Sequence, residues 1–122
     1  MTANDLVKLS AVELRRRIGA KQISPVELLD ACIAQIEAVN PAVNAICATD
    51  FDRARDQAKR DEQAVMDGEE LGLLHGLPCG VKDLDATDGL RTTLGSPLHK
   101  DDVPTEDSFM VSQVRGAGAN LF

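Results

Sequence analysis

The sequence predicts an α/β fold with a mostly parallel or mixed sheet. Three observations indicate it: helical segments fill the first half, apolar strand-like segments follow in the second half, and a further helix stands between two of these strands. Interleaved helices and strands favour this class, because the helices can then cover the faces of a shared sheet. A length of 122 residues suits one domain, and the sequence contains no internal repeat, linker or low-complexity segment.

Capping boxes mark the start of two helices near the beginning of the chain. The box at Ser10–Glu13 predicts a short helix that ends at Ile18. The box at Ser24–Glu27 predicts a longer helix, and Pro25 suits its first helical position. Apolar residues then keep a helical spacing until Asn40–Pro41, where we expect this helix to end.

Two further segments complete the first half of the chain. The apolar run Val43–Ala48 is a candidate for a short strand. Asp50 can cap a third helix, which extends from Phe51 to about Met66 and carries charges on most of its faces. The turn residues that follow, Asp67-Gly68, are expected to end this helix.

The second half changes to apolar sequence punctuated by glycine and proline. Leu77–Leu84 has the character of a buried strand, and Thr87–Pro104 is rich in turn residues and predicts a long ordered loop. Thr105 is expected to cap a helix at Ser108–Arg115. A glycine-rich turn then leads to Asn120–Phe122, the beginning of a strand. Helix, turn and strand in this order form the middle of an α/β unit.

Charge and composition exclude several classes of partner. The net charge is −7 and Trp and Tyr are absent, so no surface for a phosphate backbone or for stacked bases is expected, and no nucleic-acid partner. No apolar stretch is long enough for a membrane span or a signal core, which predicts no membrane partner and a cytoplasmic location. Cys32, Cys47 and Cys79 lie among apolar residues and are expected to be buried thiols. No cofactor or metal is expected.

Lys82 is the candidate reactive group, because it lies in the apolar strand-like segment. Burial disfavours a charged ammonium, so a lysine placed there either pairs with an acid or releases its proton and becomes a general base. In an extended strand Lys82 shares a face with Gly80, while Asp83 points the opposite way and is poorly placed to neutralise it. The alternative is a lysine at a strand end whose ammonium reaches water along its apolar stem.

Other nucleophiles and bases have weaker support. Five serines are present, but two cap helices, two lie on the last helix, one lies in the loop, and none has a Gly-x-Ser-x-Gly pattern. His75 and His99 lie near turns and are more typical of surface loops than of catalytic bases. Cys79 with His75 suggests a thiol nucleophile, although a buried thiol on the core face is the more typical state.

Several motifs in one consistent order resemble the N-terminal part of amidase signature enzymes. The resemblance implies an α/β/α fold with a mixed central sheet, of which this chain is the N-terminal portion. It also implies that residues 1–122 belong to a single amidase domain, with a helical part at about 5–66 and a strand, loop and helix at about 72–122. The motifs are Ser24–Leu28, Leu74–Asp83, Thr87–Ser96, Val103–Asp107 and Val114–Ala119.

The resemblance also implies an activity, the hydrolysis of a carboxylic amide through an acyl-enzyme that uses a Ser, a cis-Ser and a Lys. Lys82 matches the catalytic lysine, which takes a proton from the bridging cis-Ser. No Gly-Ser-Ser-Gly stretch is present, so we expect both serines beyond residue 122 and the chain to be the beginning of a longer enzyme. The isolated chain should be inactive, and the complete enzyme should act on a small-molecule amide; a homodimer is compatible with this interpretation.

Two alternatives stay open from the sequence. The amidotransferase component that acts on misacylated tRNA, its A chain, resembles the same family, although Thr87–Thr93 followed by Gly95–Pro97 is closer to the general amidases. The second alternative is a non-catalytic remnant or interaction module, whose last segment Asn120–Phe122 would expose a sheet edge to another chain.

Overall fold

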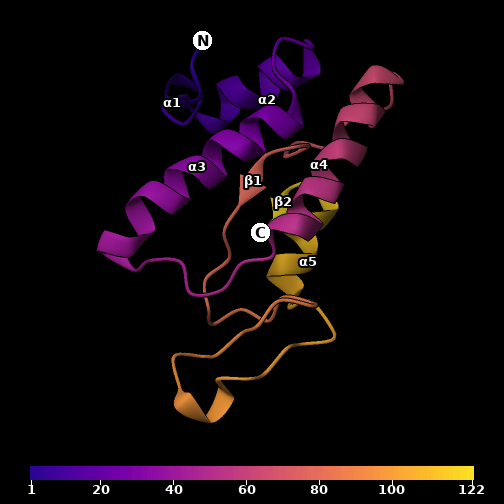
Figure 1. Ribbon diagram of the computed structural model, residues 1–122. Helices are drawn as coiled ribbons and strands as arrows, with labels where there is room; N and C mark the ends of the chain where they lie inside the picture. Colours follow the sequence, from indigo (N-terminus) through magenta and orange to yellow (C-terminus); the bar gives the residue numbers. More distant parts are fainter.

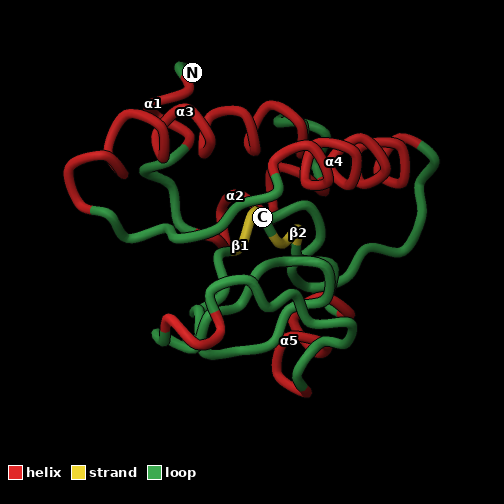
Figure 2. The backbone as a smooth tube through the Cα atoms, turned by 60° about the horizontal axis from the view of Figure 1, so that its bottom comes forward, coloured by secondary structure: helices red, strands yellow, loops and turns green.

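The computed structural model describes residues 1–122 and places a small sheet between helices (Figure 1). Helices α3 and α4 lie on one side of the sheet, and α5 lies on the other (Figure 2). The predicted α/β class is confirmed, although the chain is mostly helical. The elements are α1 (Ala3–Leu6), α2 (Ala11–Gly19), α3 (Pro25–Val43), α4 (Phe51–Met66), β1 (Pro78–Cys79), a 3₁₀ helix (Pro97–His99), α5 (Phe109–Gly116) and β2 (Asn120–Leu121).

Helix α3 is buried on two sides and joins two parts of the core. Leu28 packs in a cluster with Leu6 and Ile18 from the first two helices. Leu29, the next residue, packs in a second cluster with Ala58 of α4. The small alanine side chain allows the two helices to approach closely, which fixes the helical layer that covers the sheet. None of the helices combines the length and the apolar character that crossing a membrane requires.

The two strands pair in parallel and are shorter than the sequence predicts. Pro78 is paired with Asn120, and Cys79 is paired with Leu121. The predicted strand Leu77–Leu84 is therefore wrong in its length, because β2 offers partners to only two residues of β1. The segment from residue 80 onward continues without a strand partner.

The end of α3 differs from the prediction. The helix continues through Asn40–Pro41 to Val43 and ends at Asn44, whose φ of 49° is left-handed. Pro41 lacks an N–H, but it lies in the exposed last part of the helix, where water can satisfy the carbonyl that loses its partner.

The predicted strand at Val43–Ala48 is wrong. The Asn40 side-chain oxygen accepts the N–H groups of Ala45 and Ile46, each at 2.9 Å. These backbone groups are thus satisfied by a side chain and need no neighbouring strand. The segment between α3 and α4 is a connection without regular structure.

Side-chain caps fix the starts of the helices largely as predicted. Ser10, Ser24 and Asp50 each accept a backbone N–H of the first helical turn, and all three predicted caps are confirmed. The cap of α5 is Ser108, whose hydroxyl oxygen accepts the N–H three residues ahead at 3.3 Å. The prediction of Thr105 as this cap is wrong by three residues, because the chain turns before it enters the helix.

A buried carboxylate on α4 has one oxygen without a partner. Asp61 is 5% exposed; its Oδ1 accepts a hydrogen bond from Gln57 at 2.7 Å, whereas its Oδ2 is buried without one. Burial raises the pKa of Asp61, and the Gln57 hydrogen bond and the nearby His75 offset only part of this effect. The folded state therefore disfavours the ionised carboxylate that the unfolded chain carries at neutral pH.

We expect Asp61→Asn to be more favourable for stability at pH 7 than at pH 4. Because the folded-state pKa of Asp61 is raised, the cost of its buried charge is absent below the unfolded-state pKa and complete above the folded-state pKa. Urea denaturation of the 122-residue chain at both pH values measures the difference. Asp56→Asn, at an exposed position of α4, is the control. An effect of Asp61→Asn that is equal at the two pH values would contradict this prediction.

Candidate functional site

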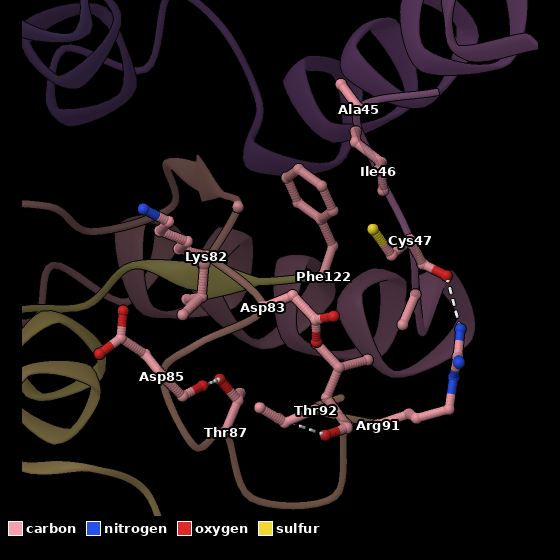
Figure 3. Close-up of a pocket in the computed structure, with 14 residues that line it drawn as sticks. Ala45, Ile46, Cys47, Lys82, Asp83, Asp85, Thr87, Arg91, Thr92 and Phe122 are labelled. Carbon is pink, nitrogen blue, oxygen red and sulfur yellow. Dashed lines mark hydrogen bonds between the residues drawn. The ribbon is translucent and has the colours of Figure 1, made fainter. Parts of the chain in front are cut away.

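An open pocket of about 400 Å³ lies at the carboxyl end of β1 (Figure 3). Three parts of the chain form it: the connection after α3, the segment that follows β1, and the aromatic residue that follows β2. The carboxyl ends of parallel strands are the usual place of ligand sites in α/β folds. The lining residues are Ala45, Ile46, Cys47, Ala48, Gly80, Val81, Lys82, Asp83, Asp85, Thr87, Leu90, Arg91, Thr92 and Phe122.

Lys82 reaches this pocket from the segment that continues β1. Cys79 and Val81 pack against the core beneath the sheet, whereas Gly80 and Lys82 are exposed, so the predicted division of faces is confirmed. The predicted burial of Lys82 is wrong in this chain, because β1 is paired only as far as Cys79 and nothing covers the side chain beyond it. None of the ion pairs in the structure involves Lys82.

Asp83 follows Lys82, but its carboxylate is bound elsewhere. Oδ1 accepts the Thr93 N–H at 2.7 Å, and Oδ2 accepts the Thr93 hydroxyl. The Asp83 carbonyl accepts the Leu94 N–H at 2.9 Å. The hydrogen bonds from Thr93 lower the pKa of Asp83, so this carboxylate stays an ionised acceptor. The prediction that Asp83 does not neutralise Lys82 is confirmed, and the backbone directly after Lys82 is anchored to the loop.

The loop that follows is held as an ordered unit, as its sequence predicts. The Asp107 carboxylate accepts the Asp88 N–H at 2.8 Å and two hydrogen bonds from Arg115, at 2.7 and 3.1 Å. Arg115 holds the pKa of Asp107 below its usual range. Arg53 of α4 donates to the Asp88 carbonyl at 2.7 Å. The loop is thus fastened to both the helical layer and α5.

The second wall of the pocket was not identified from the sequence. Arg91 donates from Nη2 to the Cys47 carbonyl at 2.7 Å and from Nη1 to the Lys100 carbonyl at 3.2 Å. Arg91 and Cys47 are 44 residues apart, and neither belongs to a helix or strand. No spacing rule joins such positions, so no signal in the sequence could have brought them together.

No serine of the chain lines the pocket, and each serine hydroxyl takes part in a local hydrogen bond. The threonine hydroxyls of the pocket are also engaged, because Thr87 and Thr92 donate to backbone carbonyls at 3.2 and 3.1 Å. The pocket therefore holds an amine and no serine nucleophile. Four serines cap helices and the fifth donates within α5: Ser10, Ser24, Ser96, Ser108 and Ser112.

The two histidines lie outside the pocket. His75 is buried and its Nε2 is 2.9 Å from the Asp61 carbonyl oxygen, so the expectation of a surface loop histidine is wrong. It is buried because the turn after α5 packs against its backbone. His99 lies on the loop as expected, with Nδ1 at 2.7 Å from the Asp102 carboxylate.

The cysteines are less buried than their apolar sequence surroundings predict. Cys32 and Cys79 are half-buried and Cys47 is exposed. Burial raises the pKa of the Cys32 and Cys79 thiols, which makes them poor nucleophiles. His75 and Cys79 form no hydrogen bond with each other, so the suggested thiol nucleophile has no activating base. No group of three His, Cys, Asp or Glu side chains is arranged to hold a metal ion.

Sequence comparisons relate these residues to known proteins. The family model Amidase matches residues 27–122. An acylamidase of Rhodococcus erythropolis is 41% identical over 119 residues, which are 97% of this chain and 25% of the relative. The A chain of the glutamyl-tRNA(Gln) amidotransferase of Neorickettsia sennetsu is 36% identical over 116 residues, which are 95% of this chain and 24% of the relative.

Solved structures show the same similarity. A bacterial aryl acylamidase described as an amidase signature enzyme matches with a TM-score of 0.86 and 33% identity, over 93% of this chain and 24% of that one. A peptide amidase from Stenotrophomonas maltophilia matches with a TM-score of 0.85 and 25% identity, over 94% of this chain and 24% of that one. The chain spans about a quarter of the length of the relatives it matches.

Proposed function

Because the chain belongs to the amidase signature family, we propose that it contributes Lys82 as the proton acceptor of a site that hydrolyses a carboxylic amide. One observation carries the proposal: Lys82 lies at the carboxyl end of β1, in an open pocket, without a carboxylate paired to its ammonium. A general base needs access to the proton that it removes, and a paired carboxylate would hold the lysine in its charged form. The proposal places residues 1–122 in a single amidase domain.

In the proposed reaction a serine hydroxyl attacks the amide carbon and forms a tetrahedral intermediate. The proton of this serine passes to a bridging cis-serine, whose own proton passes to Nζ of Lys82. The C–N bond then breaks, the leaving amine takes the proton, and water hydrolyses the acyl-serine ester to a carboxylate. Both serines would come from polypeptide other than these 122 residues, since no serine of the chain lines the pocket.

The walls of the pocket support a small-molecule amide with an apolar substituent as the substrate. Ile46, Leu90 and Phe122 line it, and apolar walls with a few polar groups are typical of small-molecule sites. The net charge of −7 gives no support to a nucleic-acid substrate for this part of the protein. A cytoplasmic location and a homodimer stay predictions from the sequence.

A chimera tests the proposed function. Residues 1–122 replace the matched quarter of the Rhodococcus acylamidase, and folding is checked by a cooperative thermal transition. We expect the chimera to release nitroaniline from an N-acyl nitroanilide and to react with a fluorophosphonate probe, which labels activated serines. The isolated chain is expected to do neither, because it supplies a base without a nucleophile. A folded chimera without hydrolysis, or a specifically labelled isolated chain, would contradict the proposal.

A second candidate is the function of the related glutamyl-tRNA(Gln) amidotransferase chain. The 36% identity to the Neorickettsia sennetsu protein favours it. The same residues grafted into that protein, with its partner chains present, would then restore glutamine-dependent amidation of misacylated tRNA. The host in which the graft recovers the larger fraction of its native kcat/KM identifies the function. Recovery in neither host would favour a non-catalytic module.

A further inference from the structure

One wall of the pocket belongs to no helix or strand. The connection Ala45–Ala48 joins α3 to α4, and Asn40 of α3 holds its first two residues. The Asn40 Oδ1 accepts both of their N–H groups at 2.9 Å, and Nδ2 donates to the Ile46 carbonyl at 3.1 Å. These bonds fasten the wall to α3, but they do not set its distance from the opposite side, where Lys82 lies.

Arg91 makes the hydrogen bond that joins the two sides. Its guanidinium donates to the Cys47 carbonyl at 2.7 Å and to the Lys100 carbonyl at 3.2 Å. Figure 3 shows this side chain reaching the wall at one edge of the pocket, while Lys82 lies at the other edge. No other hydrogen bond connects Ala45–Ala48 to the loop. A planar guanidinium suits this position, because it can donate to two carbonyls at once.

The other end of this connection is fixed to Lys82. Thr93, two residues after Arg91, donates from its N–H and its hydroxyl to the Asp83 carboxylate. Asp83 is the next residue after Lys82, and its carbonyl is also bonded to the loop. A short series of contacts therefore runs from Lys82 through Asp83 and Thr93 to Arg91, and from Arg91 to the wall.

We infer that Arg91 is a positioning residue that holds the wall Ala45–Ala48 at a fixed distance from Lys82. The inference rests on the proposed function for its catalytic consequence. Arg91 acts through the wall and touches no reacting atom, so its loss should weaken substrate binding and leave the proton transfer largely intact. The expected signature is a higher KM with little change in kcat.

Hydrogen exchange tests the structural part of the inference without any activity. In Arg91→Gln, the Ala45 and Ile46 amides should exchange about five- to tenfold faster, as the loss of one charge-assisted hydrogen bond predicts. Mass spectrometry of the peptide that contains these amides measures this, in the isolated chain and in the acylamidase chimera. The matched control is Arg60→Gln on α4, where the arginine is exposed and donates only to Gln57. Unchanged exchange in Arg91→Gln would overturn the inference.

Kinetics of the chimera test the functional part. Arg91→Gln is expected to raise KM about fivefold or more with kcat within twofold, and Arg91→Lys, which keeps one donor group, should recover part of the loss. A fall in kcat with an unchanged KM would also overturn the inference. An inactive chimera with Arg91 intact would instead count against the proposed function, and the exchange measurement would still decide whether Arg91 holds the wall.

Discussion

Lys82→Met in the acylamidase chimera is expected to lower kcat/KM by about 10²- to 10⁴-fold, the usual contribution of a general base. Methionine keeps much of the length of the side chain but cannot accept a proton. The serine nucleophile would then lose its route for deprotonation, so fluorophosphonate labelling should fall with the hydrolysis rate. Because Lys82 is exposed and makes no ion pair, the free energy of unfolding should change by less than about 0.5 kcal/mol.

Two further variants separate proton transfer from charge. Lys82→Arg keeps a positive charge in the pocket, but guanidinium stays protonated and cannot act as a base, so this variant should be as inactive as Lys82→Met. Lys100→Met removes an exposed lysine of the same loop that does not line the pocket, and its kcat/KM should stay within twofold. Hydrolysis by Lys82→Met within threefold of the unsubstituted chimera would show that another group accepts the proton.

Local sequence could predict Lys82 because its evidence lies within a few residues. Side chains alternate along an extended chain, so the exposed face of Gly80 and Lys82 and the opposite direction of Asp83 follow from their order alone. The degree of burial does not follow from order. The apolar run around Lys82 predicts a buried strand, but burial needs a partner on each side, and only Pro78 and Cys79 have a neighbouring strand.

The pocket walls depend on contacts between distant parts of the chain, which the sequence does not reveal. Asn40 takes the place of a strand partner for Ala45 and Ile46, and a helix-ending signal at Asn40–Pro41 gives no hint of this. Arg91 looks like an ordinary surface residue until Cys47 is placed beside it. Helix caps such as Ser24 were predictable because donor and acceptor are two or three residues apart.

Gly118→Ala is expected to lower the free energy of unfolding of the 122-residue chain by about 2–4 kcal/mol. Gly118 has a φ of 98°, which favours glycine, and an added Cβ would lie 2.8 Å from the His75 Cα and 3.0 Å from its nitrogen. These neighbours are backbone atoms and cannot rotate away. Gly116→Ala is the matched control, since an added Cβ there meets no atom within 4 Å and the residue ends α5.

The same substitution should also reach the site, because the turn at Gly118 sets β2 beside β1. The Gly118 carbonyl accepts the Gly76 N–H at 3.1 Å, and two residues later the Asn120 N–H donates to the Leu77 carbonyl at 2.9 Å. If the turn moves away from His75, the strand pairing that directs the chain toward Lys82 must shift with it. In the chimera, Gly118→Ala should therefore lower kcat at a temperature where the protein is still folded. Gly116→Ala should be neutral or raise stability by up to about 1 kcal/mol, as alanine does in helices. Equal melting temperatures for the two variants would show that the close approach to His75 is not needed.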